Sequence, residues 1–279
     1  MNQRLEAVRA LMSDAGLDAF IVPRADEYLG EYIPERNERL KWTTGFNGSA
    51  GVAIILADSA AIFVDGRYTV QVRQEVSTEF FEIHQLIEEP HVEWLQKQLQ
   101  PGAKIGYDPR LHSLAWQRAA VEVFRAADQQ MLALTDNIID RCWVDRPEPI
   151  IKAAILLDLA FTGVSSADKR RRIGADIAAS NADVALIFAP DSVSWLLNIR
   201  GTDIPCLPIV QSFAMLSSDG SLVLFVDPAR IPEGFDEHVG SGVEVLPESS
   251  AEKTFERYRG MSVLGDAQAA NAWTQLALV

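Results

Sequence analysis

The chain has 279 residues, of which 48% are hydrophobic and 23% charged, a composition typical of a globular protein with a buried core. Its formal net charge of −14 disfavours nucleic-acid binding, because an acidic surface repels a phosphate backbone. No apolar run approaches the ~20 residues that a membrane helix needs, and the charged N-terminus does not resemble a signal peptide. Cys142 and Cys206 are the only cysteines, too few for a disulfide framework or a zinc cluster. We therefore expect a cytoplasmic protein without membrane or nucleic-acid partners.

Predicted helices and strands alternate through the first half of the chain. Apolar residues recur at helical spacing before Gly16, which is a suitable C-cap, and Ser113 is a suitable N-cap for a later helix. In chain order we expect a helix up to residue 16, a strand over 18–22, an irregular segment over 24–39, paired strands over 52–56 and 61–65, a helix over 68–76, a strand over 80–83, a helix over 91–99, a strand over 104–107 and a helix over 113–124. This alternation predicts an α/β fold with a mixed β-sheet.

The second half of the chain repeats the pattern of the first. A strand, a tryptophan, two paired strands and a Phe-Val-Asp terminus follow one another around Trp42 and again around Trp195. We therefore predict two homologous domains, each a mixed β-sheet flanked by helices. They cover residues 1–146 and 165–279, and the proline-rich stretch that starts at Arg146 opens a linker over 147–164.

The second domain is predicted to open with a helix that runs through Ser180, with Ser165 or Ser166 as its N-cap. Asp168 then falls in the first turn, where the helix dipole favours a negative charge. The basic run Lys169–Arg172 is interpreted as the solvated face of this helix.

The sequence offers no complete catalytic or metal-binding motif. Its four histidines are scattered and none lies in a His-Glu-x-x-His frame, so we expect neither a metal nor another cofactor: His84, His91, His112 and His238. Ser49 is preceded by Asn47 where a nucleophile elbow needs glycine, and the glycines around it precede a strand rather than a phosphate-binding helix. We expect no catalytic residue, and interpret Gly45, Gly48 and Gly51 as sites of close backbone packing.

Two stretches remain as candidate sites. Asp65-Gly66-Arg67-Tyr68 follows a buried strand, and strand ends are where α/β sheets meet ligands. Arg67 either reaches a carboxylate or peptide carbonyl there, or forms a local pair with Asp65 that shapes the turn.

The second stretch is Trp195–Asp203. Trp195, Leu196 and Ile199 would share a helical face that ends at Gly201. This stretch is either a capped helix against the sheet or a contact with another domain or subunit.

Four motifs together resemble the N-terminal region of the larger, three-domain Xaa-Pro aminopeptidases, the aminopeptidase P family. They are Gly45–Gly51, Phe63–Tyr68, Trp143–Pro147 and Trp195–Asp203. The resemblance implies two domains with a creatinase-N-terminal-like fold. It also implies that the chemistry belongs to a third, "pita-bread" domain, where two Asp, one His and two Glu hold two divalent metals, usually Mn²⁺. The sequence stops before such a domain, so this chain alone is expected to be inactive.

The resemblance further implies a role for each candidate stretch. Arg67, Tyr68 and Asp65 would face the substrate, and Trp195, Asn198, Arg200 and Asp203 would brace the second domain against its neighbours. The implied partners are the protein's own catalytic domain, short Xaa-Pro peptides and a second copy in a homodimer.

Two alternatives stay open at the level of sequence. The chain is either the N-terminal part of such an aminopeptidase or a free-standing binding module that has lost the peptidase domain. An α/β enzyme of unrelated chemistry would need a titratable cluster that the sequence does not show. Creatinase and prolidase carry a single N-terminal domain of this kind, so the duplication argues against both.

Overall fold

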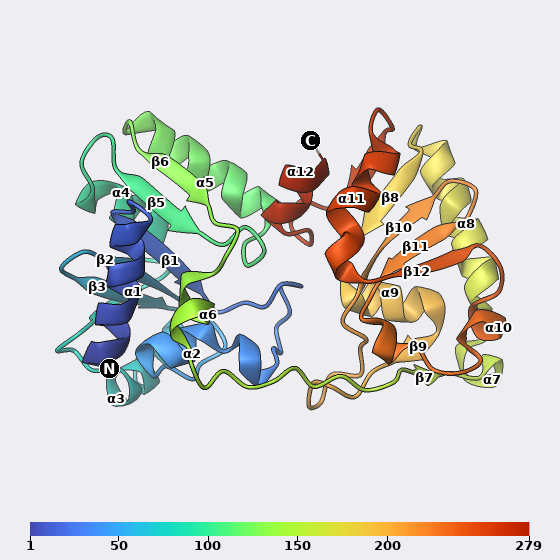
Figure 1. The fold of residues 1–279 in the computed structure, drawn as a ribbon, viewed down its shortest axis with the longest axis horizontal. Coiled ribbons are helices and arrows are strands. Elements are labelled where there is room, and N and C mark those ends of the chain that lie inside the picture. Colours follow the sequence, from blue (N-terminus) through green and yellow to red (C-terminus); the bar gives the residue numbers. More distant parts are fainter. Residues whose placement is uncertain (279) are drawn as a thin grey trace. The chain divides into compact units, whose positions relative to one another are not determined.

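The computed structural model describes residues 1–278, which divide into two compact units (Figure 1). Unit 1 comprises Met1–Asp26 and Glu35–Glu148, and unit 2 comprises Glu27–Pro34 together with the chain from Pro149 onward. Each unit is built around one mixed β-sheet with helices on both faces, which confirms the predicted fold class. Within residues 1–278, no helix has the length and apolar character required to cross a membrane.

The sheet of unit 1 has six strands in the order β4-β3-β2-β1-β5-β6. The bounds of these strands are Ala19–Pro23 (β1), Gly51–Leu56 (β2), Ala60–Val64 (β3), Glu82–Gln85 (β4), Lys104–Tyr107 (β5) and Gln130–Ala133 (β6). Strands β1, β2 and β3 pair antiparallel, whereas the outer pairs are parallel. Side chains alternate between the two faces, so that Phe20 packs with the helices of one face and Ile21 with those of the other.

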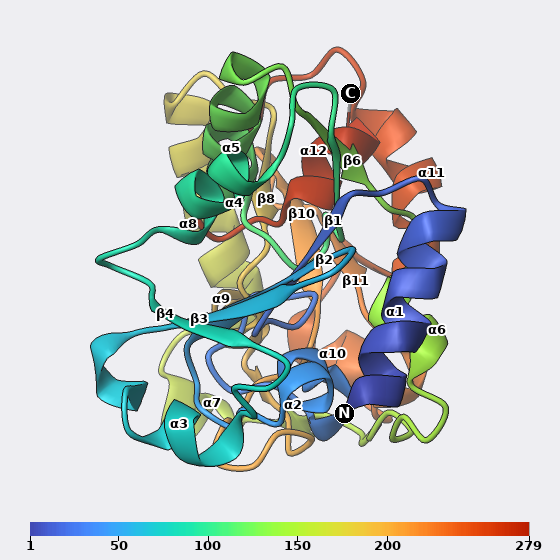
Figure 2. The ribbon, with the colours of Figure 1, turned by 90° about the vertical axis from the view of Figure 1, so that its left-hand side faces the viewer.

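Six helices cover this sheet. They are α1 (Asn2–Asp14), α2 (Arg39–Thr44), α3 (Gln71–Glu75), α4 (His91–Gln98), α5 (Leu114–Ala126) and α6 (Ile138–Cys142). Helix α1 buries Leu5, Val8 and Met12 at the predicted helical spacing, and lies beside α6 on one face of the sheet (Figure 2). Ser113 caps α5 by accepting a hydrogen bond from the Trp116 amide at 3.1 Å, as expected from the sequence.

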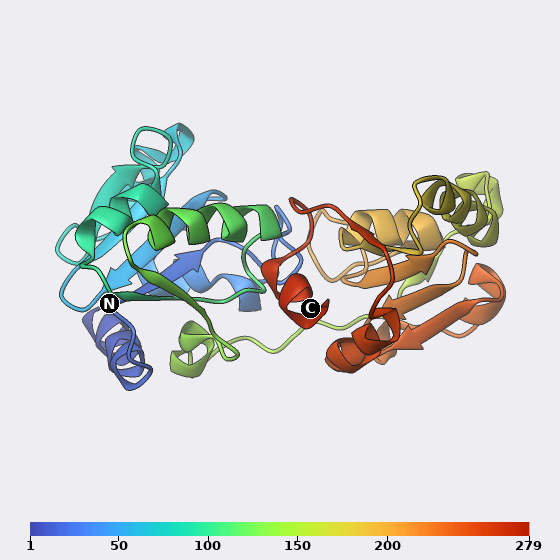
Figure 3. The same ribbon diagram turned by 90° about the horizontal axis from the view of Figure 1, so that it is seen from above.

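Unit 2 repeats this arrangement. Its sheet has the order β12-β11-β10-β8-β13, with bounds Val184–Ile187 (β8), Phe213–Ser217 (β10), Leu222–Phe225 (β11), Val243–Leu246 (β12) and Val263–Gly265 (β13). Helices α8 (Ser166–Ala179), α9 (Pro190–Leu197) and α10 (Phe235–Val239) lie on one face, and α11 (Ala251–Phe255) and α12 (Ala272–Leu278) on the other (Figure 3). The parallel and antiparallel pairings follow the same sequence as in β1 to β5, which confirms the internal duplication.

Residues 147–164, which the sequence predicts to be a linker, contain two short elements. β7 (Ile155–Leu156) pairs antiparallel with β9 (Ile199–Arg200), and α7 (Leu159–Thr162) follows. The domain boundaries at 1–146 and 165–279 stay a prediction.

The structure corrects three sequence-based expectations about element bounds. The strand expected over 80–83 is β4 and begins at Glu82, and the helix expected over 68–76 is a 3₁₀ turn over Gly66–Tyr68 followed by α3. The helix that contains Trp195 does not run to Gly201: it ends at Leu197, because Asn198 adopts a left-handed conformation with φ 56°. Asn tolerates this region better than most residues, and the sequence pattern gives no sign of it.

The interpretation of Lys169–Arg172 as a solvated face is wrong for its first half. Lys169 and Arg170 are 6% and 3% exposed, and Arg170 donates to the carbonyl oxygens of Gly220, Val239 and Ser241 at 2.7–2.9 Å. Burial lowers the pKa of both side chains. Long cationic side chains thus serve here to satisfy buried carbonyl groups, which a charge pattern alone does not reveal.

Candidate functional site

The first candidate site lies at one end of the strand pair β2–β3. Gly51, the first residue of β2, is paired with Val64, the last residue of β3. This register brings the Gly45–Gly51 loop beside the turn that follows β3. We call Ser49, Asp65, Arg67 and Tyr68 the Arg67 corner.

Asp65 holds the turn of the Arg67 corner. Its carboxylate accepts a hydrogen bond from the Arg67 backbone amide at 2.8 Å, and others from Arg67 Nε at 2.9 Å and Nη2 at 2.5 Å. The hydrogen bond from the Arg67 side chain is the main cause that lowers the pKa of Asp65. The Arg67 side chain is nevertheless 67% exposed. Arg67 therefore pairs with Asp65 and still leaves most of its side chain accessible to a ligand.

Tyr68 forms the other side of the corner. Its hydroxyl lies 2.7 Å from Ser49 Oγ, and hydrogen bonding from Ser49 lowers its pKa. The ring packs edge-on against Phe46 at 5.5 Å between centroids, and the Arg67 guanidinium carbon lies 5.4 Å from the centre of the Tyr68 ring.

The glycines of this loop permit its close packing. A Cβ on Gly48 would lie 2.2 Å from the Phe46 ring, and one on Gly51 would lie 3.2 Å from the backbone oxygen of Phe63 on the paired strand. Gly45, with φ 87°, ends α2 as a left-handed C-cap. The interpretation of these glycines as packing positions is confirmed at all three, because a Cβ on Gly45 would lie 3.0 Å from the Glu75 backbone oxygen. Gly45 is in addition a helix end, which the sequence did not indicate.

The Arg67 corner is rich in hydrogen-bond donors but has no net charge, because Asp65 balances Arg67. Such a surface suits recognition of a ligand oxygen rather than bond cleavage. Among residues 1–278 there is no group of three or more His, Cys, Asp or Glu side chains that could hold a metal ion.

The second candidate stretch lies around the end of α9 in unit 2. Asn198, 4% exposed, accepts a hydrogen bond from Lys169 Nζ at 2.6 Å and donates to the Val164 carbonyl at 2.9 Å. Arg200 donates to the carbonyl of its neighbour Ile199 at 2.8 Å. Trp195 is half exposed, with Lys169 Nζ 4.1 Å from the centre of its ring.

Asp203 is 5% exposed, pairs with Arg230 and accepts a hydrogen bond from the Lys152 backbone amide at 3.0 Å. The contacts described for Asn198 and Asp203 thus lie inside unit 2. The interdomain role of this stretch stays a prediction. Trp195 has the largest exposed fraction of the four candidate residues in it.

Arg230 is a residue that the sequence analysis did not single out. It ends a 3₁₀ turn over Pro228–Arg230, in which Asp227 accepts a hydrogen bond from the Ala229 amide at 2.9 Å, as Asp65 does from Arg67. The turn after β3 therefore recurs after β11. The Phe-Val-Asp sequence that precedes both turns is the feature of the sequence that could have predicted this repeated turn.

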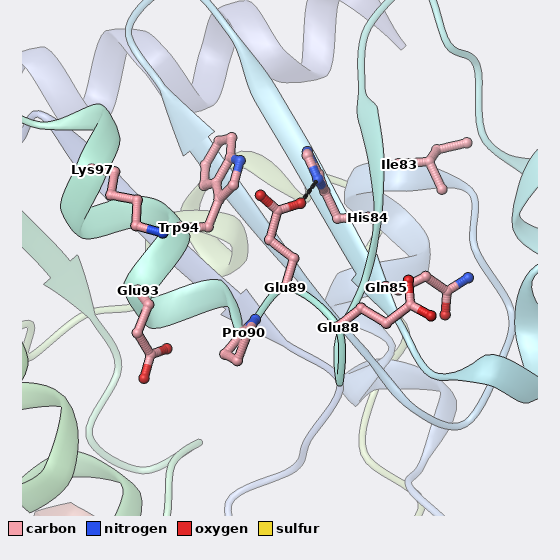
Figure 4. Close-up of a pocket in the computed structure, with 9 residues that line it drawn as sticks. All are labelled: Ile83, His84, Gln85, Glu88, Glu89, Pro90, Glu93, Trp94 and Lys97. Carbon is pink, nitrogen blue, oxygen red and sulfur yellow. Dashed lines mark hydrogen bonds and ion pairs between the residues drawn. The ribbon is translucent and has the colours of Figure 1, made fainter.

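A pocket of about 430 Å³ lies elsewhere in unit 1, between the end of β4 and α4 (Figure 4). Its lining residues are Ile83, His84, Gln85, Glu88, Glu89, Pro90, Glu93, Trp94 and Lys97. His84 and Glu89 point toward one another and are joined by a 2.6 Å hydrogen bond, with Trp94 beside them, while Glu93 points away. His84 also stacks on Phe63 at 4.8 Å between centroids, so this imidazole is part of the packing of the sheet.

Comparison with known families identifies both halves of the chain. Residues 4–142 and residues 145–278 each match a family model described as the creatinase/prolidase N-terminal domain. Among curated proteins, aminopeptidase P1 of Lotus japonicus is 34% identical over 253 residues, covering 88% of this chain and 38% of that protein. The Xaa-Pro aminopeptidase ApepP of Drosophila melanogaster is 34% identical over 251 residues, covering 87% of this chain and 41% of that protein.

A solved structure gives the same result. The X-prolyl aminopeptidase of Caenorhabditis elegans, described as a cytosolic enzyme with a dinuclear active site, superposes with a TM-score of 0.85 at 25% identity. The match covers 92% of this chain and 44% of that one. The chain thus spans less than half the length of these relatives.

Proposed function

Since this chain belongs to the creatinase/prolidase N-terminal domain family and carries two such domains in tandem, we propose that it is the non-catalytic N-terminal part of an Xaa-Pro aminopeptidase. The observation that carries the proposal is the tandem match over residues 4–142 and 145–278, together with the similarity of 88% of this chain to an aminopeptidase P relative. The full-length protein would remove the N-terminal residue that precedes proline. Two divalent metals, with Mn²⁺ as the expected ion, would be held by its catalytic domain.

Within that enzyme, the present region would shape access of the substrate and contact the catalytic domain. The Arg67 corner would face the incoming short Xaa-Pro peptide, with Arg67 and Tyr68 as donors to peptide oxygens and Asp65 holding Arg67. Trp195 and Arg200 would supply the interdomain or subunit surface, with Asn198 and Asp203 fixing the segment from within. The enzyme would be cytoplasmic and form a homodimer.

Peptidase activity of the isolated region tests the first part of the proposal. Residues 1–279 are mixed with an Xaa-Pro-Pro peptide and Mn²⁺, and release of the first residue is followed beside the full-length protein. We expect turnover by the full-length protein alone. Turnover by the isolated region would show that the proposed division of labour is wrong.

The role of the Arg67 corner is tested in the full-length protein. We expect Arg67→Ala to lower kcat/KM for an Xaa-Pro-Pro peptide by about tenfold, the loss of one charge-assisted hydrogen bond. Arg125→Ala is the matched control, because Arg125 is 73% exposed and also pairs with a nearby carboxylate, that of Glu122. Equal kcat/KM values for Arg67→Ala and Arg125→Ala would show that Arg67 only shapes the turn and does not contact the substrate.

A further inference from the structure

Two motifs that lie apart in the sequence are joined at the Arg67 corner by the Ser49–Tyr68 hydrogen bond. Ser49 belongs to the loop before β2, whereas Tyr68 ends the turn after β3. Hydrogen bonding from Ser49, first from its side chain and then from its backbone, lowers the pKa of Tyr68, and the charge of Arg67 acts in the same direction. The two hydroxyl oxygens lie 2.7 Å apart, and either hydroxyl can donate this hydrogen bond. In either direction the hydrogen bond ties the Tyr68 side chain to the loop that contains Ser49.

The Tyr68 ring is also the surface on which Arg67 rests. Phe46, 1% exposed, supports the ring edge-on with an interplanar angle of 83°, and the guanidinium lies over the ring within the range of a cation–π contact. Asp65 holds the same guanidinium through Nε and Nη2. The Asp65 carboxylate and the Tyr68 ring thus together orient the Arg67 side chain.

From these contacts we propose that Ser49 is a positioning residue, which fixes the Tyr68 ring and through it the direction in which Arg67 meets the substrate. The inference rests on the proposed function, in which this corner faces the peptide. The ligand group that fits best is a backbone carbonyl oxygen, because Asp65 already balances the charge of Arg67 and leaves a neutral, donor-rich surface. Ser49 itself would not touch the substrate.

The experiment uses the full-length protein and measures kcat and KM separately. The variants are Ser49→Ala, Ser49→Thr, Tyr68→Phe and Arg67→Ala, together with the double variant Ser49→Ala/Arg67→Ala. Ser77→Ala is the matched control, because Ser77 is an exposed serine of unit 1 whose hydroxyl accepts a hydrogen bond from the nearby Glu79 amide. Tyr68→Phe removes the hydroxyl and keeps the ring, so it removes the Ser49 bond together with any hydrogen bond from Tyr68 to the substrate, and Ser49→Ala is the variant that separates the two.

We expect Ser49→Ala and Tyr68→Phe to lower kcat/KM by about 2- to 10-fold, the range that corresponds to one net hydrogen bond. Ser49→Thr, which keeps the hydroxyl, should restore the rate. In the Arg67→Ala background the Ser49→Ala change should have almost no further effect, because the residue that it positions is gone. Thermal unfolding midpoints of all variants should stay close to one another, which a merely structural role would not predict.

The outcomes separate this inference from the proposed function. If Arg67→Ala lowers kcat/KM and Ser49→Ala leaves it unchanged, or adds its full effect in the double variant, Ser49 does not position Arg67 and only the present inference fails. If Arg67→Ala itself leaves kcat/KM unchanged, the substrate-facing role of the corner fails first.

Discussion

Asp140 holds a partly buried ion-pair network in unit 1, and its removal should destabilise the helices that the network joins. Its carboxylate binds Arg39 through two hydrogen bonds, to Nε at 2.7 Å and to Nη2 at 2.9 Å, and also pairs with Arg146 Nη1 at 2.7 Å. Arg39 is 1% exposed, so Asp140→Asn would take this carboxylate away from a buried guanidinium. Loss of one partner of a buried pair costs about 3–5 kcal/mol. Because the Asp140 side chain is 23% exposed and water can partly replace it, we expect about 3 kcal/mol.

The effect should be confined to the elements that the network joins. Arg39 opens α2 and Asp140 lies in α6, so protection of these helices against amide hydrogen exchange should fall by about 100-fold, the ratio that 3 kcal/mol corresponds to. Helix α8 of unit 2 serves as the internal reference. Glu122→Ala, which breaks an exposed pair on α5, should cost less than about 1 kcal/mol. Unchanged protection of α2 and α6 in Asp140→Asn would refute the reasoning.

Two further predictions concern stability. Burial lowers the pKa of His112 to about 3 and that of His91 to about 4, so both side chains are neutral in the folded protein near pH 7. These values lie below the pKa of about 6.5 that a histidine has in the unfolded chain. The stability that the two neutral side chains contribute is therefore complete above pH 6.5 and is lost as the pH falls. Each histidine lowers the free energy of unfolding by up to about 1.4 kcal/mol per pH unit. The free energy of unfolding, measured in urea, should therefore fall less steeply between pH 6 and pH 4 in His112→Gln than in the unchanged protein. An equal pH dependence of the two proteins would contradict the low pKa of His112. Gly48→Ala should cost about 1–3 kcal/mol because the new methyl group would overlap the Phe46 ring, whereas Gly66→Ala, with nothing within 4 Å, should stay within about 0.5 kcal/mol; similar unfolding midpoints for the two would argue against the packing role.

The central strands of each sheet could be predicted from the sequence because their signal is local, whereas the outer strands β6, β12 and β13 were not predicted. Apolar runs bounded by turn residues mark β1, β2 and β3, and the repeat of that pattern around Trp195 predicts their counterparts β8, β10 and β11. The errors fall where one residue overrides a pattern. Asn198 ends α9 in a left-handed conformation, and nothing in the spacing of Trp195, Leu196 and Ile199 distinguishes that end from a longer helix.

The buried polar groups could not be predicted, because their partners are distant in the chain. Lys169 and Arg170 look like a solvated basic run until the structure brings the Asn198 side chain and the Gly220 carbonyl to them. The same holds for Asp203 and Arg230, which lie 27 positions apart and are both less than a tenth exposed. Burial of a charge depends on long-range acceptors, and a single sequence does not record which acceptors come near.

The duplicated turns after β3 and β11 explain why the functional proposal falls on unit 1. Both turns start from an Asp that caps the second residue of the turn, but the arginines occupy different places. In unit 1 the arginine is the second turn residue, Arg67, and its side chain is 67% exposed. In unit 2 the arginine is the third residue, Arg230, where unit 1 has Tyr68, and it is 6% exposed and paired with Asp203. A shift of one position along the same backbone thus separates an arginine that stabilises the interior of unit 2 from one that can meet a ligand, and Arg67 is the member of this pair on which a substrate contact can be tested.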